Sequence, residues 1–186
     1  MPNLELPQPC SEVPPVDCNC YSDGGVLYPT FSEYQLGGAG IVWTQRDIVA
    51  KPLHRNELEL AHSIEDGNVA IWGKISGQRC DSTRAEIIAA IYYLSPDGPA
   101  HCGIDSLNTV KITKLIQEFQ GCPEGKNWGL MANGDVLQVF YQHLQAKGFL
   151  SATNSKVLGH AKQVDVDKGR TTLINLEGNN LSDTCA

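Results

Sequence analysis

The stretch that decides the fold is Cys20-Tyr21-Ser22-Asp23-Gly24-Gly25. Its lead-in, from Val16 to Tyr21, mixes β-branched, sulfur-containing and aromatic residues in the way that a buried strand does. The two glycines after Asp23 predict that this strand ends in a turn at that point. Because glycine has no side chain, a large ligand can approach the backbone beside the aspartate. An isolated Asp-Gly-Gly is more often an ordinary turn, so the other acidic residues of the chain decide between the two interpretations.

The composition indicates one globular domain that is not strongly basic. The 186 residues are enough for a substantial core, and the hydrophobic fraction of 41% is ordinary for such a domain. The apolar runs are too short to span a bilayer and no signal peptide is recognisable, so no membrane partner is expected. A net charge of −7 argues against strong free-standing binding of nucleic acid, because Lys and Arg supply most of the affinity for phosphates. An enzyme acting on nucleic acid would therefore need bound cations, or help from a neighbouring domain or protein.

The cysteines show no spacing that is typical of a zinc site or a disulfide framework. We expect reduced thiols in an intracellular protein, located in the cytoplasm or the nucleus. A metal site built from the first three is the minor alternative. The seven positions are Cys10, Cys18, Cys20, Cys80, Cys102, Cys122 and Cys185.

The first half of the chain predicts an arm followed by three strands. Residues 1–15 hold five of the ten prolines and are expected to form a proline-rich arm or linker. After the strand that ends at Asp23, strands are expected over 37–43 and 69–76, and the simplest arrangement of the three is an antiparallel meander. The polar segment 45–66 is expected to be an insertion or long loop, with room for a helical turn.

The second half alternates between helices and short strands. Together the elements predict an α/β fold, in which a five-stranded mixed sheet with its first three strands antiparallel carries helices on both faces. One domain is expected to span 16–186, and its final helix is expected to be cut off at Ala186, as in a segment of a longer protein. The expected elements are helices over 83–94, 106–119 and 134–147, strands over 100–105 and 155–158, a polar loop over 159–176 and a last helix that opens at Gly178.

Four acidic residues fall where this fold would gather them. Asp23 and Asp105 end strands, Glu86 lies in the first turns of a helix, and Asp183 lies in the last helix. Four converging carboxylates repel one another unless divalent cations bind between them. Oxygen ligands alone favour Mg²⁺ or Mn²⁺ over zinc, and two such ions about 4 Å apart would clamp the attacking and leaving oxygens of a phosphodiester displacement.

The order of these acids and their neighbours resembles the type 1 ribonucleases H. Each matching piece is weak alone, but all five in the correct order make a strong signal that covers roughly residues 16–186. The segment 133–140 and the loop after His160 look more like the ribonuclease H domains of retroelement polyproteins. The five pieces are Ser22-Asp23-Gly24-Gly25, Ser82-Thr83-Arg84-Ala85-Glu86, Asp105-Ser106, Gly159-His160-Ala161 and Gly178-Asn179-Asn180-Leu181-Ser182-Asp183.

The resemblance implies cleavage of the RNA strand of an RNA–DNA hybrid, beside a reverse transcriptase domain. Asp23, Glu86, Asp105 and Asp183 would hold two Mg²⁺ ions, for which Mn²⁺ can substitute. His160, on a flexible loop, would assist proton transfer or product release. Glu86 would also contact the ribose 2′-hydroxyl, the group that distinguishes RNA from DNA.

The same resemblance implies which residues contact the hybrid, and the sequence departs from the family in several respects. Ser82 and Thr83 stand where the family often has two asparagines, Leu107 replaces a residue that is polar in some relatives, and the helix over 134–147 has one Lys and no Arg. The long gap between Asp23 and Glu86 is assigned to the insertion. The implied substrate contacts are Gly24, Ser82, Thr83, Arg84, Ser106 and Asn179.

Other interpretations remain open from the sequence. A 3′–5′ exonuclease or a transposase-like nuclease would share the fold, although the Gly-His and Gly-Asn pieces argue against it. A degenerate, inactive binding module is the alternative of a different class; the complete set of four carboxylates argues against it and the net charge slightly for it. At single positions, Asp105 and Asn179 are candidate helix caps, Glu86 a first-turn acid favoured by the helix dipole, and His160 a solvated loop residue.

Overall fold

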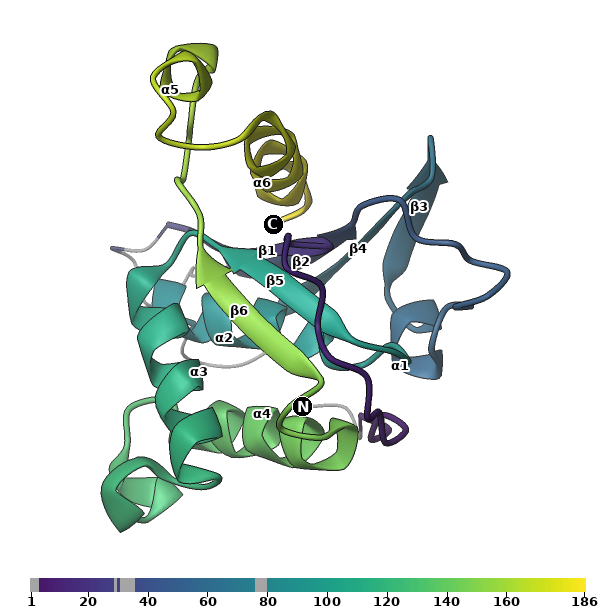
Figure 1. Cartoon of the computed structure of the whole chain (residues 1–186). Helices are drawn as coiled ribbons and strands as arrows, with labels where there is room; N and C mark the ends of the chain where they lie inside the picture. The colour runs from purple at the N-terminus through teal and green to yellow at the C-terminus, as the bar shows by residue number, and fades with distance from the viewer. Residues whose placement is uncertain (1–3, 29, 31–35, 76–79) are drawn as a thin grey trace.

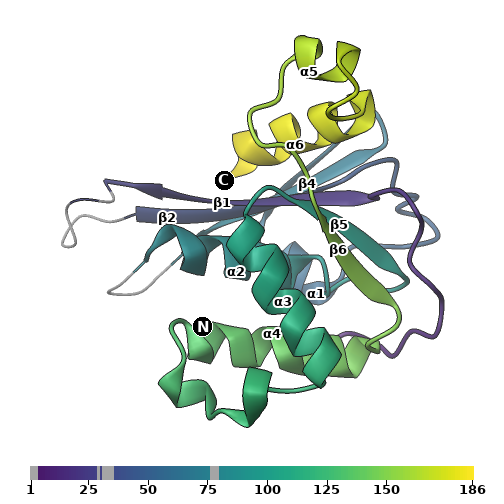
Figure 2. The same cartoon turned by 60° about the vertical axis from the view of Figure 1, so that its left-hand side comes forward.

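A computed structural model describes residues 4–28, 30, 36–75 and 80–186. These residues form a six-stranded sheet with the strand order β3-β4-β2-β1-β5-β6. Helices cover both faces of this sheet: α2, α3 and α4 lie on one side, and α6 lies on the other (Figures 1 and 2). The strands are β1 (Cys20–Leu27), β2 (Leu36–Trp43), β3 (Ala61–Glu65), β4 (Asn68–Ile75), β5 (Ala100–Ile104) and β6 (Ala152–Lys156). The helices are α1 (Arg55–Leu58), α2 (Ser82–Tyr92), α3 (Leu107–Phe119), α4 (Gly134–Lys147), α5 (Gln163–Asp167) and α6 (Leu173–Cys185).

The strand directions confirm the predicted mixed sheet and its antiparallel meander. β1 pairs with β2 and β2 with β4 in antiparallel fashion, whereas β5 runs parallel to both β1 and β6. The number of strands was wrong, because the sheet has six rather than five. The additional strand is β3, which forms a hairpin with β4 and comes from the segment 45–66, together with the short helix α1. That segment is therefore an ordered insertion that widens the sheet.

β1 does not end at Asp23, as the glycines had predicted, but continues to Leu27. Gly24 and Gly25 pair in register with β2, so they extend the ladder instead of turning the chain. Their small size serves packing against the layers above and below. A Cβ added to Gly24 would lie 2.2 Å from the carbonyl carbon of Ala85 in α2, which means that the helix backbone rests directly on this strand.

The first three long helices match the predicted ones closely, and their caps are visible. Asp81 caps α2, where its Oδ1 accepts a hydrogen bond from the Arg84 amide at 2.7 Å. Ser106 caps α3, so Asp105 is not the cap that the sequence had left open. α4 ends at Gly148, whose φ of +111° favours glycine.

The C-terminal elements begin earlier than predicted. β6 precedes its expected position by a few residues, and the loop expected over 159–176 contains the short helix α5. α6 begins after Thr172, whose hydroxyl accepts a hydrogen bond from the Asn175 amide, so Asn179 lies inside the helix and does not cap it. Gly178 does not open the helix; a Cβ there would lie 2.2 Å from the Tyr21 ring, which explains the glycine by close packing.

The core lies between the sheet and the α2–α4 layer. Seven successive residues of α2, from Ala85 to Ile91, are buried, because the helix lies between the sheet and α4. Its hydrophobic residues pack with Phe140 of α4 and Ile71 of β4. None of the helices in the described part of the chain is long and apolar enough to cross a lipid bilayer.

Residues 4–15 follow the surface of the domain and are held by hydrogen bonds at three points. Asn56 of α1 makes two hydrogen bonds with the backbone of Glu5, at 2.9 and 2.7 Å. The Cys10 amide donates to the carbonyl of Lys147 at 2.7 Å, and the carbonyl of Pro15 lies 2.9 Å from Nδ1 of His101. The proline-rich arm therefore contacts α1, α4 and β5.

Candidate metal centre

Three carboxylates meet where β1, β5 and α2 lie together. Asp23, Glu86 and Asp105 each offer an oxygen, and these oxygens all lie within 4.8 Å of one another. The register of the parallel strands explains two of the three, because Ser22 pairs with Ile104 and the next residue of each chain segment is the acid. Glu86 joins them from the second turn of α2.

Gly24 brings the helix to the strand. A Cβ at this position would lie 2.3 Å from the backbone nitrogen of Glu86, so only glycine lets α2 approach β1 this closely. The contribution of Gly24 to the site is therefore the placement of Glu86 beside Asp23. The backbone of α2 fills the space that a side chain at position 24 would occupy, so no room for a ligand is left there.

Burial and mutual repulsion raise the pKa values of Glu86 and Asp23. Burial raises the pKa of Glu86 to about 9, and the nearby charges of Asp23, Asp105 and Asp183 add to the shift. Burial also raises the pKa of Asp23 to about 6, again with help from Asp105 and Asp183. Oε2 of Glu86 is buried and has no hydrogen-bond partner among the described residues. Burial and like charges therefore dominate at Glu86, whereas the nearby His160 partly opposes the rise in pKa at Asp23.

The donor set fits a divalent cation. All three groups are carboxylates, which are the hard oxygen ligands that Mg²⁺ and Mn²⁺ prefer. The unpartnered Oε2 of Glu86 is a buried lone-pair donor that a cation would satisfy. Positive charge at this point would also offset the burial and the repulsion that together raise the pKa of Glu86.

Asp183 lies beside the cluster but outside the group of three. It comes from α6, where its Oδ1 accepts a hydrogen bond from Nδ2 of Asn179 at 3.1 Å. Its Oδ2 lies 3.4 Å from Nδ1 of His160. Burial and the charge of Asp105 raise its pKa, while His160 opposes that rise. The structure thus places Asp183 within electrostatic reach of the other acids and pairs it with the predicted histidine.

The loop that carries His160 passes directly over Asp105. A Cβ on Gly159 would lie 2.3 Å from Oδ2 of Asp105, so the glycine of the Gly-His pair is needed for this close approach. His160 has a φ of +48°, and 89% of its side chain is exposed. The sequence singled out the histidine; the contact between Gly159 and Asp105 became visible only in the structure.

Tyr21 docks α6 onto the sheet and so sets the position of Asp183. Its buried ring lies between Gly103 and Gly178, where a Cβ on either glycine would collide with it. Its hydroxyl donates to Oδ1 of Asn175 at 2.8 Å. Asn179, one residue after Gly178, is also buried, and its Oδ1 has no partner among the described residues. Sequence reasoning missed Tyr21, because nothing in the pattern marks a ring that lies between two glycines distant in the chain.

The predicted substrate contacts at the start of α2 differ in accessibility. Ser82 is exposed, and Thr83 lines a hollow of about 420 Å³ between α2, α3 and the segment 123–132. Arg84 instead makes a bidentate ion pair with Asp135 of α4, with distances of 2.9 and 2.7 Å. This pairing was not foreseen from the sequence, because the partners are 51 residues apart.

The side chain of Ser106 is hydrogen-bonded within the protein. Its Oγ accepts hydrogen bonds from the amide and the hydroxyl of Thr109, at 3.3 and 2.9 Å. This places the hydroxyl in the α3 cap, next to Asp105, where it fixes the end of the strand that carries the acid.

Among the comparisons with known proteins, only the comparison with solved structures finds a match. No protein-family model matches the chain, and no curated protein matches it. A foamy viral protease–reverse transcriptase, solved in complex with an RNA/DNA hybrid, aligns with 90% of this chain at a TM-score of 0.52 and 15% identity. This chain spans 19% of the length of that protein.

Two further solved structures are ribonuclease H domains. The solution structure of the PFV RNase H domain covers 90% of both chains, with 15% identity and a TM-score of 0.49. LC9-RNase H1, described as a type 1 RNase H with the type 2 active-site motif, covers 85% of this chain and 67% of its own, with 15% identity and a TM-score of 0.46.

The chain has a ribonuclease H-like fold. The likeness to the foamy viral protein confirms the fold that the order of the five sequence motifs had predicted. At 15% identity this likeness establishes the fold alone, so activity has to be argued from the site.

Proposed function

We propose that the chain is an endoribonuclease that hydrolyses the RNA strand of RNA–DNA hybrids. The observation that carries this proposal is the convergence of Asp23, Glu86 and Asp105 within 4.8 Å, on the strands and helix of a ribonuclease H-like fold. The foamy viral protein with this fold was solved with an RNA/DNA hybrid, which supports the choice of substrate.

Two Mg²⁺ ions, replaceable by Mn²⁺, are the proposed cofactors. Asp23, Glu86 and Asp105 would hold them, with Asp183 completing the set from α6. When bound, such ions supply Lewis-acid stabilisation of the charge that develops on the attacking and leaving oxygens of a phosphodiester. The protein contributes the geometry: two acids from adjacent parallel strands and one from the helix that Gly24 brings close.

His160 is the proposed proton carrier of the site. The carboxylate of Asp183 lies beside Nδ1, which favours a proton on that nitrogen and leaves Nε2 to accept or deliver one. Its exposed side chain lies next to the loop glycine that contacts Asp105, so it can meet a substrate from the open side.

The proposed contacts with the hybrid start at the N-terminus of α2. Ser82 and Thr83 can reach a ligand directly, since both are accessible at the first turn. Arg84 would contact a phosphate only by exchanging its bond to Asp135. The remaining three of the implied set act by positioning: Gly24 places Glu86, Ser106 fixes the end of β5 and Asn179 holds Asp183.

The proposed context is a retroelement polyprotein in which residues 16–186 form the ribonuclease H-like catalytic domain beside a reverse transcriptase domain. The alignment with part of a protease–reverse transcriptase chain supports this context. An intracellular location, in the cytoplasm or the nucleus, is proposed because all seven cysteines are free thiols.

A comparison of substrates tests the proposal. The purified chain is incubated with an end-labelled RNA–DNA hybrid, duplex DNA, duplex RNA and single strands, with Mg²⁺ or Mn²⁺ and with chelator. Internal cuts in the RNA strand of the hybrid alone, only with metal, are expected. Cleavage of DNA from its 3′ end would instead indicate the exonuclease alternative. A folded chain that leaves every substrate intact with both metals would favour the degenerate binding module, for which the position of Asp183 outside the group of three is the supporting observation.

A further inference from the structure

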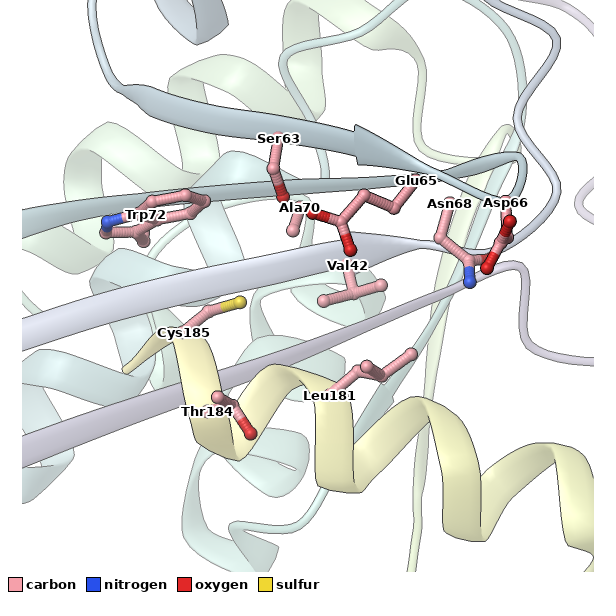
Figure 3. Close-up of a pocket in the computed structure, with 10 residues that line it drawn as sticks. All are labelled: Val42, Ser63, Glu65, Asp66, Asn68, Ala70, Trp72, Leu181, Thr184 and Cys185. Atoms are coloured by element: carbon pink, nitrogen blue, oxygen red, sulfur yellow. The ribbon is translucent and has the colours of Figure 1, made fainter.

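The face of the sheet that carries α6 is only partly covered. A hollow of about 430 Å³ lies between α6 and the β3–β4 hairpin, on the side away from the core (Figure 3). β3 forms one wall, α6 the other, and the outward-facing residues of β4 and β2 form the floor. Its lining consists of Val42, Ser63, Glu65, Asp66, Asn68, Ala70, Trp72, Leu181, Thr184 and Cys185.

The hollow combines an apolar floor with an acidic rim. Ala70 and Trp72 alternate along β4 with fully buried residues of the opposite face, and Leu181 of α6 is 42% exposed. Glu65 and Asp66, both exposed, stand at the hairpin end. Among the described residues that line it, none is a lysine or an arginine. This distribution repels phosphate and favours a ligand that is cationic and apolar together.

The wall formed by β3 is also an open strand edge. β3 is terminal in the strand order and pairs only with β4, so the peptide groups on its other side face outward. Within the described part of the chain, residues 61–65 make no other backbone-to-backbone hydrogen bond as donors or acceptors. Four of the five residues are exposed. An edge of this kind accepts an added strand, whose main chain supplies affinity and whose alternate side chains supply specificity.

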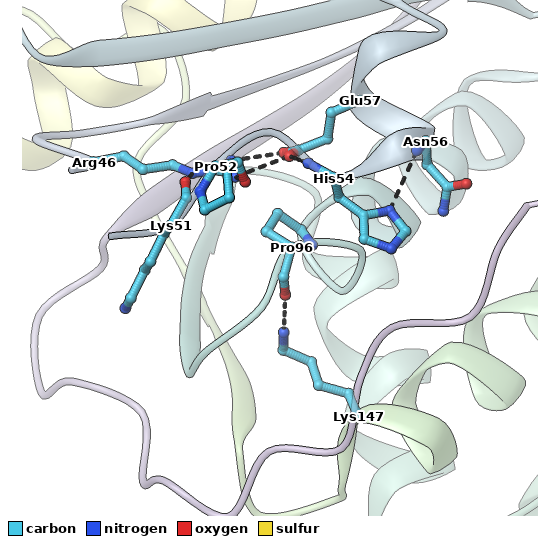
Figure 4. Close-up of polar contacts among 8 residues, drawn as sticks. All are labelled: Arg46, Lys51, Pro52, His54, Asn56, Glu57, Pro96 and Lys147. Atoms are coloured by element: carbon cyan, nitrogen blue, oxygen red, sulfur yellow. Dashed lines mark hydrogen bonds and ion pairs between the residues drawn. The ribbon is translucent and has the colours of Figure 1, made fainter. Parts of the chain in front are cut away.

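The insertion that displays this edge is held together by buried polar contacts among its own residues. Arg46 and Glu57 form an ion pair at 2.7 Å with only 3% of each side chain exposed (Figure 4). The same guanidinium donates to the carbonyls of Lys51 and Pro52, and the second Glu57 oxygen accepts from the amide of His54. The insertion therefore has a buried, fully bonded base, while its strand β3 remains exposed.

We propose that the β3 edge and the adjoining hollow form a docking site for an extended, basic and apolar segment of a partner protein. The segment adds a strand beside β3. Its residues on the α6 side lie next to Ser63 and Glu65, where Lys or Arg pairs with the acidic rim and apolar residues two or four positions away, on the same face, reach Trp72. The site is separate from the carboxylate cluster, so the inference does not depend on the proposed function.

A synthetic peptide with valine and lysine on one face of the extended chain and threonine on the other serves as the probe, titrated into the full chain while backbone amide resonances are recorded. We expect shifts confined to β3, β4 and the end of α6. A peptide of the same length with glutamate in place of lysine should leave them unchanged. N-methylation of alternate peptide bonds on one edge should weaken binding by about tenfold or more, because it removes the donors that pair with β3.

Two variants separate specific docking from general charge attraction. Glu65→Lys with Asp66→Lys should reduce the affinity for the lysine–valine peptide by about tenfold or more, whereas Glu118→Lys, an exposed acid on α3, should not. Amide spectra of the free variants show that each is folded. The inference is overturned by an absence of shifts in 61–72, by equal binding of the glutamate peptide, or by binding that survives the double change. Shifts of the same residues that grow with protein concentration alone would overturn it too, since the occupant would then be a second copy of the chain.

Discussion

Glu86 comes close to Asp23 because Gly24 carries no side chain. A methyl group at that position would lie 2.2 Å from the Ala85 carbonyl carbon, and helix backbone cannot move aside as a flexible side chain can. We expect Gly24→Ala to lower the free energy of unfolding by about 3 kcal/mol and to abolish metal-dependent activity. Urea denaturation measures the first effect. Gly121→Ala is the matched control, because its nearest atom outside the neighbouring residues is 3.8 Å away. Equal stability of the two variants would contradict this explanation of the cluster.

Glu86 makes the stability of the metal-free protein depend on pH. Its pKa rises from an ordinary 4.5 to about 9 in the folded state, so the folded state prefers the protonated form. The contribution to stability is therefore complete below about pH 4.5 and is lost as the pH rises through about 9. We expect the free energy of unfolding in chelator to fall across this window, and Glu86→Gln to remove much of the fall. Denaturant titrations at several pH values measure it; parallel curves for the two proteins would count against a buried, repelled Glu86.

At the residue scale, the sequence predicted the approach of three of the four acids but not the residues that support them. Asp23, Glu86 and Asp105 were predictable because their types and order form a recognisable set. The ion pair of Arg84 with Asp135 depends on how two helix N-termini pack, and no local pattern encodes that distance. The role of Gly159 has the same origin, because its neighbour Asp105 is remote in sequence.

Among the structural elements, the insertion that carries α1 and β3 depends on one buried ion pair. Removing the charge of Glu57 would leave Arg46 buried and uncompensated. We expect Glu57→Gln to lower the free energy of unfolding by about 3 to 5 kcal/mol. Glu59→Gln is the matched control: the exposed pair of Glu59 with Arg55 should contribute less than about 1 kcal/mol. Similar losses in both variants, measured by urea denaturation, would show that the buried pair does not hold the insertion together.

At the element scale, helices were more predictable from the sequence than strands and the boundaries of elements. α2, α3 and α4 follow from runs of apolar residues and their caps, which are local signals. β3 was missed because its residues are mostly exposed, so no alternation of apolar and polar residues reveals it. The continuation of β1 through Asp23-Gly24-Gly25 was missed for a different reason. Glycine is needed there because helices pack closely against the strand, and this packing is determined by the tertiary structure alone.

At the scale of the whole molecule, a cation in the cluster should stabilise the fold. A ligand that binds only the folded state adds about 2.7 kcal/mol at a concentration 100-fold above its dissociation constant. We expect Mg²⁺ to raise the melting temperature at neutral pH, and to have no such effect on a variant with Asp23→Asn and Asp105→Asn. Asp97→Asn, an exposed acid outside the site, should keep the full effect. An equal rise in all three proteins, measured by calorimetry, would mean that the ion binds elsewhere.

The rate at which the chain cuts the RNA strand of a labelled hybrid tests the central claim most directly. The measurement compares the parent protein, Asp105→Asn and Asp97→Asn in Mg²⁺, each shown to be folded by circular dichroism. The account predicts cuts within the RNA strand, a loss of at least about 100-fold in Asp105→Asn because several kcal/mol of charge stabilisation disappear, and an unchanged rate in Asp97→Asn. Cleavage by Asp105→Asn at the parent rate, or no cleavage by the folded parent, would contradict it.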